Sequence, residues 1–128
     1  MSRVPILRLG RILLASIQFD LTDDQVLLLQ EDILALISRG KADGIVLDVT
    51  GLDVIDSYVA RALNETTRMV RLIGGEVVLT GMQPIVALTL VEIGREIIGI
   101  DAAIDLEAGV EKLRNVLRER DEDLPRSA

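Results

Sequence analysis

The feature that most constrains this chain is an alternation between two kinds of apolar pattern. Short apolar runs, bounded by glycine or polar residues, alternate with longer segments in which apolar residues recur every three or four positions. The clearest short run covers residues 44–49, and an unbroken run of this kind is typical of a strand buried on both faces. Strands that alternate with helices predict an α/β fold with a mainly parallel sheet and right-handed crossovers.

The patterns predict the element order β-β-α-β-α-β-α-β-α. Residues 4–17 are apolar on both sides of Gly10, which indicates two short strands joined by a tight turn and an antiparallel element at one side of the sheet. Further strands are predicted at residues 44–49, 76–80 and 102–104. Helices are predicted at 22–40, 57–73, 84–95 and 106–119. Thr22 and Gln25 have the spacing of a capping box, and Asp105 is the expected N-cap of the last helix.

The helical period also predicts which side of each helix is buried. In the third helix, Ile85, Leu88 and Val91 or Glu92 form the expected inner stripe, which makes Val86 and Leu90 additional apolar residues. The first helix has additional apolar residues at Leu27, Leu28 and Leu34. These belong either to the ordinary core or to contacts between subunits. In the last helix we expect Leu106, Val110, Leu113 and Leu117 on one face, opposite Glu107, Glu111, Arg114 and Arg118.

Length and composition set the class of protein. A chain of 128 residues suits one domain, which we expect over residues 1–119, with a disordered polar tail at 120–128. Arg3, Arg8 and Arg11 interrupt the apolar N-terminus, so it does not predict a signal peptide. The apolar runs are far shorter than the roughly 20 residues of a membrane span. The absence of cysteine fits a reducing cytoplasm, and a net charge of −7 disfavours nucleic acid as a partner.

Several kinds of catalytic site are excluded by missing residue types. The chain has no histidine and no cysteine, which removes the Ser-His-Asp arrangement and zinc clusters. No glycine-rich phosphate loop follows a predicted strand. We therefore expect no enzyme activity, no cofactor and no metal site. Asp53 and Asp56 could share a magnesium ion or act in acid/base chemistry, but two carboxylates in one loop are common in solvated turns.

Asp48 stands near the end of the central predicted strand, as the phospho-acceptor of a receiver domain does. The acidic pair of a receiver is missing, because Ala15, Ser16 and Ile17 stand at its place, and the later strands bring no lysine. We interpret Asp48 as a loop anchor that accepts hydrogen bonds from nearby backbone N–H groups.

The stretch from Asp48 to Leu63 is the most informative part of the sequence. A buried strand ends, a loop follows, and Asp56 and Ser57 open a helix, where both residue types are favoured N-caps. This pattern resembles the STAS domain family of sulfate-transporter and anti-sigma-factor-antagonist modules, and the resemblance covers nearly the whole chain. It implies a STAS-type fold, with Ser57 at the family's phosphorylated position. The Asp-Ser-Ser-Gly of common bacterial antagonists is not kept, since Tyr58 and Val59 follow Ser57.

Four further segments, at residues 16–18, 30–32, 78–84 and 89–94, are similar to the RsbS group of this family, the single-STAS-domain subunits of the bacterial stressosome. The resemblance implies a non-catalytic, cytoplasmic scaffold subunit that assembles with itself and with RsbR-type STAS paralogues. Such a subunit sequesters an RsbT-type switch kinase in a stress-response sigma-factor pathway. Phosphorylation of Ser57 releases the kinase, and a phosphatase resets the cycle. Nucleic acid and membranes are not expected partners.

Asp53 and Asp56 are the residues expected to support this phosphorylation site. Asp56 either orients the Ser57 hydroxyl, or meets the metal of the kinase, or only caps the helix. Thr80 and Thr89 are weaker candidates for modification, since packing would bury both.

Two rival functions stay open at this point. One is an anti-sigma factor antagonist that binds an anti-sigma kinase directly, and the sequence after Ser57 speaks against it. The other is a small α/β enzyme or ligand-binding domain, which only the fold class supports.

Overall fold

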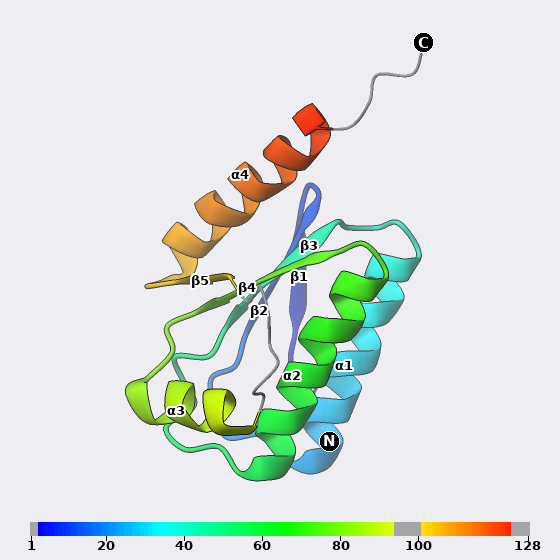
Figure 1. The fold of residues 1–128 in the computed structure, drawn as a ribbon. Coiled ribbons are helices and arrows are strands. Elements are labelled where there is room, and N and C mark those ends of the chain that lie inside the picture. Colours follow the sequence, from blue (N-terminus) through cyan, green and yellow to red (C-terminus); the bar gives the residue numbers. More distant parts are fainter. Residues whose placement is uncertain (1–2, 94–100, 124–128) are drawn as a thin grey trace.

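The computed structural model describes residues 3–93 and 101–123 (Figure 1). The strands are β1 (Ile6–Leu9), β2 (Ile12–Ser16), β3 (Gly44–Asp48), β4 (Glu76–Thr80) and β5 (Asp101–Ala103). The helices are α1 (Asp23–Ser38), α2 (Ser57–Leu72), α3 (Pro84–Ile93) and α4 (Leu106–Asp123). The predicted element order is confirmed. The predicted end of α3 near Arg95 lies outside the described residues.

The five strands form one sheet in the order β1-β2-β3-β4-β5. β1 pairs with β2 in antiparallel fashion across the turn at Gly10, whose φ of 61° suits a glycine. The other neighbours are parallel. This is the mainly parallel α/β sheet that the sequence predicts, with its antiparallel strand at one edge.

The strand order decides where the helices lie. Each parallel strand is added on the same side of the one before it, so right-handed crossovers bring α1, α2 and α3 to one face of the sheet. α1 packs against α2, and α2 against α3. α4 follows the last strand and packs on the other face, against β2, β3, β4 and β5 (Figure 1). Within the described residues, one face of the sheet is therefore covered by three helices and the other by a single helix.

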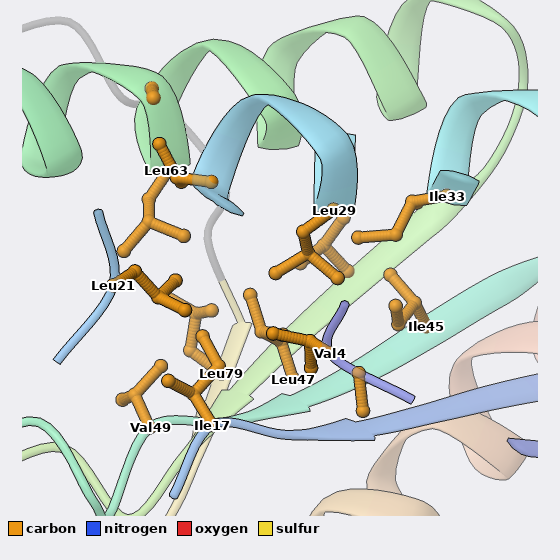
Figure 2. Packing of buried hydrophobic residues seen from close by; sticks show 14 of the residues in the cluster. Val4, Ile17, Leu21, Leu29, Ile33, Ile45, Leu47, Val49, Leu63 and Leu79 are labelled. Atoms are coloured by element: carbon orange, nitrogen blue, oxygen red, sulfur yellow. The ribbon is translucent and has the colours of Figure 1, made fainter. Parts of the chain in front are cut away.

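The larger core lies between the sheet and α1, α2 and α3. Its residues come from alternate positions of the strands and from the inner sides of the helices. Figure 2 shows aliphatic side chains meeting there, including Ile17, Leu29, Ile45, Leu63 and Leu79. The chain has two aromatic residues, Phe19 and Tyr58, and both are exposed. The core therefore contains no aromatic side chain. Leu, Ile, Val and Ala thus build the interior.

A smaller core lies under α4. It contains Ile12, Val46, Val78, Leu113 and Leu117. Gly109 brings α4 close to the sheet, because a Cβ at this position would overlap Cγ2 of Thr80 and lie 3.0 Å from Cγ1 of Val46.

The predicted helix starts are confirmed. The Thr22 hydroxyl accepts a hydrogen bond from the Gln25 backbone at 3.2 Å, and the Gln25 side chain accepts one from the Thr22 backbone at 2.9 Å. Asp105 accepts a hydrogen bond from the backbone N–H of Ala108 at 2.9 Å. Both caps satisfy backbone donors that the first turn of a helix leaves open.

The predicted inner stripe of α3 is wrong. Val86 and Leu90 are buried, whereas Ile85, Leu88 and Val91 are exposed over half or more of their surface. Because apolar residues occupy nearly all positions of α3, the period of the pattern does not distinguish its inner side from its outer side.

Two predictions about α4 are also corrected. Glu107, Glu111, Arg114 and Arg118 do not lie opposite the apolar stripe but beside it, facing the β1–β2 hairpin across a groove. The expected disorder of residues 120–128 is wrong for 120–123, which continue the helix. Long-range ion pairs hold this last turn, from Asp121 to Arg11 at 2.6 Å and from Arg120 to Glu76 at 3.6 Å. Residues 124–128 lie outside the described residues.

Candidate functional site

The loop between β3 and α2 is anchored to the core by its own apolar side chains. Val49, Leu52 and Ile55 are buried, whereas Asp53, Val54 and Asp56 point outward. Gly51 lies against the backbone of Ile17 and Gln18, where a Cβ would overlap main-chain atoms. The loop is therefore pressed onto the end of the sheet, and residues between these buried positions are presented to solvent.

A row of polar side chains crosses the sheet where this loop begins. Ser16, Asp48 and Thr80 end the three neighbouring strands β2, β3 and β4 and lie in register. The Asp48 carboxylate is almost completely buried and accepts hydrogen bonds from three hydroxyl groups: Thr50 at 2.8 Å, Thr80 at 2.9 Å and Ser16 at 3.2 Å. Asp48 is thus a loop anchor, but its partners here are side-chain hydroxyls and not the backbone N–H groups we expected.

Gln83 ties the same loop to the segment after β4. Its side-chain amide donates to the carboxylate of Asp53 at 3.0 Å and to the backbone carbonyl of Thr50 at 3.4 Å. The Asp53 carboxylate is thereby engaged with the β4–α3 connection. Gly81 makes room for this arrangement, since its φ is 68° and a Cβ there would overlap the Thr50 hydroxyl.

Ser57 is the first residue of α2, and Asp56 is the N-cap. The Asp56 carboxylate accepts a hydrogen bond from the backbone N–H of Val59 at 2.8 Å. Ser57 is exposed, and no residue of the described chain forms a hydrogen bond with its hydroxyl. Since Asp56 already caps the helix, capping does not explain a serine at position 57.

The surroundings of Ser57 combine apolar and charged groups. Val54 and Tyr58 are both exposed, Val54 over 67% of its surface. Asp53 and Asp56 add negative charge, and Arg61 adds a positive charge one helical turn after Ser57. An exposed hydroxyl between apolar contacts and charges of both signs is suited to a protein partner.

The other two hydroxyls considered for modification are less accessible. Thr80 is completely buried and donates to Asp48, so a kinase cannot reach it in this fold. Thr89 is half-buried and donates to the backbone carbonyl of Ile85 at 2.9 Å.

Neither a metal-binding cluster nor a membrane-spanning helix is present in the described residues. Over residues 3–93 and 101–123, no group of three or more acidic side chains could hold a metal ion. In the same part of the chain, no helix is long and apolar enough to cross a membrane.

The polar row of Ser16, Asp48 and Thr80 was not predicted as a unit. The sequence does contain a regular spacing, since each of these residues ends a strand and Asp48 is 32 positions from both Ser16 and Thr80. Only the parallel register of the sheet shows that this spacing brings them together.

Comparison with known proteins points to one family. The family model described as STAS domain matches residues 4–111. The solved structure of RsbS from Moorella thermoacetica, in a serine-to-glutamate variant, is 38% identical with a TM-score of 0.81, covering 91% of this chain and 99% of that one. A chain from the stressosome structure is 34% identical with a TM-score of 0.72, covering 89% and 99%.

More distant relatives extend the comparison. RsbRA of Bacillus subtilis (strain 168), named an RsbT co-antagonist protein, is 26% identical over 83 residues, which are 65% of this chain but only 30% of that protein. The anti-sigma factor antagonist SpoIIAA is 14% identical with a TM-score of 0.65, covering 94% of this chain and 99% of that one, and at that identity it shows the fold alone.

Proposed function

The chain belongs to the STAS domain family, and on this basis we propose that it is a non-catalytic subunit of a stressosome-type assembly, switched by phosphorylation of Ser57. The observation that carries the proposal is the Ser57 hydroxyl, which is exposed at the first turn of α2 and is not needed as a cap. The similarity to RsbS over nearly the whole chain supports it.

The partners follow from the same relatives. The match to RsbRA supports assembly with RsbR-type STAS paralogues, and the name of that protein connects it with RsbT. The proposed kinase is of the RsbT type, and this chain sequesters it until Ser57 is phosphorylated. A phosphatase returns the subunit to its first state. The protein acts in the cytoplasm, in a stress-response sigma-factor pathway.

The chemistry of the switch is electrostatic. A phosphate adds about −1.5 to −2 charges at pH 7. The N-terminus of α2 favours an anion, and Arg61 lies one turn away on the same side of the helix, while Asp53 and Asp56 oppose it. We expect the local fold to survive, because these terms act in opposite directions.

The docking surface changes far more than the fold does. A partner that covers Val54 and Tyr58 has to desolvate the new charge, and every 1.4 kcal/mol of that cost weakens binding about tenfold. Release of the kinase needs no rearrangement of the sheet.

The test is phosphosite mass spectrometry on the protein mixed with the RsbT-type kinase of the same genome, ATP and magnesium. We expect phosphate on Ser57 and release of the kinase. In Ser57→Ala we expect neither, while Ser38→Ala, which removes an exposed hydroxyl at the far end of α1, behaves as the wild type. Phosphate on another residue, or none, would contradict the proposal. Binding of an anti-sigma kinase in place of the RsbT-type kinase would favour the direct antagonist.

The variant Asp56→Asn separates a contact with the metal of the kinase from the other roles considered for Asp56. Asparagine keeps the side-chain oxygen that accepts from Val59 and is an equally good N-cap. Normal phosphorylation of this variant would exclude a contact between Asp56 and the metal of the kinase. Loss of phosphorylation with unchanged stability would support a contact between Asp56 and the metal of the kinase.

A further inference from the structure

The face of the sheet under α4 is only partly covered. Alternation along β1 directs Leu7 and Leu9 to this face, beside Leu14 of β2. Leu7 is 66% exposed and Leu9 46%, while Leu14 is half-buried. Since α1, α2 and α3 all lie on the other face, this chain supplies no second described helix to cover the β1–β2 hairpin.

A groove of about 730 Å³ runs between α4 and the hairpin. Leu9 and Leu14 line it on the sheet side, and Leu106 and Val110 are the apolar residues on the helix side. An open apolar channel beside a helix has the shape that receives another helix.

The charges on the helix wall of the groove are arranged in two blocks. Glu107 and Glu111 occupy the first half of α4, and Arg114 and Arg118 occupy the second half. No described residue forms an ion pair with any of these four side chains. Within the helix, Glu107 is four residues from Glu111 and Arg114 four from Arg118, so like charges are neighbours. Glu111 and Arg114 are three residues apart with opposite charges, and acidic residues early and basic residues late in a helix suit its dipole, so the helix itself tolerates the arrangement. The helix wall presents an acidic block and a basic block to the groove, and an occupant with the reverse order of charges complements both.

A second copy of α4 has the required charges. Two antiparallel copies related by a two-fold axis between residues 112 and 113 place Glu111 of one helix beside Arg114 of the other. The same axis places Glu107 beside Arg118, because each pair is symmetric about that point. Both pairs occur twice in such a dimer, as they do in any isologous interface.

We propose that two copies of this protein dimerise through this face, each laying its α4 against the hairpin of the other. The two helices then share one layer between the two sheets, and each covers the leucines that the other sheet leaves open. This deepens the proposed function, since it names the face used for assembly of identical subunits. It does not require phosphorylation of Ser57, which lies on α2 at the opposite face, so the two proposals fail in separate experiments.

The experiment is analytical ultracentrifugation of the full chain and of two charge reversals. We expect the wild type to form a dimer of twice the chain mass of 14.0 kDa. Glu111→Arg places arginines opposite each other, and Arg114→Glu places glutamates opposite each other, so each raises the dissociation constant at least about tenfold. An equal mixture of the two variants restores opposite charges at both central pairs, and we expect it to dimerise as the wild type does.

The control is Glu119→Arg, an exposed charge reversal on α4 outside the groove, which should leave the dimer unchanged. Circular dichroism should show the same helix content in every variant, which excludes unfolding as the cause. A wild type that stays monomeric up to about 1 mM would overturn the proposal. Dimers of the single variants as tight as the wild type, or a mixture that stays monomeric, would also overturn it. Association only with an RsbR-type paralogue would assign the face to a different partner and reject the second copy.

Discussion

At the scale of single residues, Asp48 is the centre of the candidate site although it is not at the surface. Its carboxylate joins three strand ends and the start of the loop that leads to Ser57. A buried carboxylate that accepts three hydroxyl hydrogen bonds is well satisfied, and its removal leaves those hydroxyls without an acceptor.

This arrangement predicts the effect of two substitutions. Asp48→Ala orphans the Thr80 hydroxyl in the interior, and we expect it to lower the free energy of unfolding by about 2–4 kcal/mol. Asp48→Asn keeps an oxygen for Thr50 and Thr80 and presents an amide to the Ser16 hydroxyl, so the loss should be about half as large or less. Urea unfolding followed by circular dichroism measures both. Equal losses in the two variants would show that the hydroxyl partners are not the reason for the stability.

The residues of the site were predictable to different degrees. Asp56 and Ser57 follow one another at a helix start, a local pattern that a sequence displays directly. The contacts of Asp48 with Ser16 and of Asp53 with Gln83 join residues about 30 positions apart. Such contacts depend on strand register and loop packing, which no local pattern contains. We had expected Asp53 to support Ser57, and the role of Asp53 in phosphorylation stays a proposal.

At the scale of elements, the fit of α4 to the sheet depends on the absence of one side chain. Glycine inside a helix is unfavourable by about 1 kcal/mol relative to alanine. Gly109 is nonetheless needed, because Thr80 and Val46 occupy the place of its Cβ. A close approach between helix and sheet therefore outweighs helix propensity at this position.

The variant Gly109→Ala tests this balance. Propensity alone predicts a more stable protein, whereas overlap with Thr80 predicts a loss of about 1–3 kcal/mol from overpacking. We expect a net decrease in the free energy of unfolding, measured by urea titration. The matched control Glu119→Ala introduces alanine at an exposed position of α4 and should change stability by less than about 0.5 kcal/mol. A stabilised Gly109→Ala would mean that α4 shifts freely on the sheet.

The elements also show why helix faces were harder to predict than helix positions. In α2, buried Val59, Leu63 and Val70 are separated by charged residues, so the helical period distinguishes its inner side from its outer side. In α3, nearly every residue is apolar, so the choice between two faces depends on the neighbouring α2 and on the direction of the preceding loop. Tertiary packing made that choice, and the sequence pattern alone could not.

At the scale of the whole molecule, one arginine connects distant parts of the chain. Arg11, in the turn between β1 and β2, forms ion pairs with Asp43 before β3 and with Asp121 in the last turn of α4, both at 2.6 Å. The hydrogen bond from Arg11 lowers the pKa of Asp121 below its ordinary value. The hairpin and the end of α4 are therefore linked by a contact that depends on pH.

The sign of this dependence follows from the lowered pKa. The contribution of Asp121 is complete above the carboxylate pKa of the unfolded chain and is lost as the pH falls through the lower value of the folded state. We expect amide protection in the last turn of α4 to stay unchanged from pH 7 to about pH 5 and to decrease as the pH falls further, as measured by hydrogen exchange corrected for intrinsic rates. Asp121→Asn should reduce this protection already at neutral pH and remove its dependence on this carboxylate. The same acid response in both proteins would contradict the assignment.

The strand order has a consequence for how the chain reaches its fold. Every strand pairs with the strand before it in the chain, so no later segment has to be inserted between two that have already joined. Each new strand and its preceding helix can dock as they leave the ribosome, at the growing edge of the sheet. Only α4 has to wait for the complete sheet, because it crosses strands from β2 to β5. Until it docks, the apolar side of the unfinished sheet is the surface most exposed to aggregation.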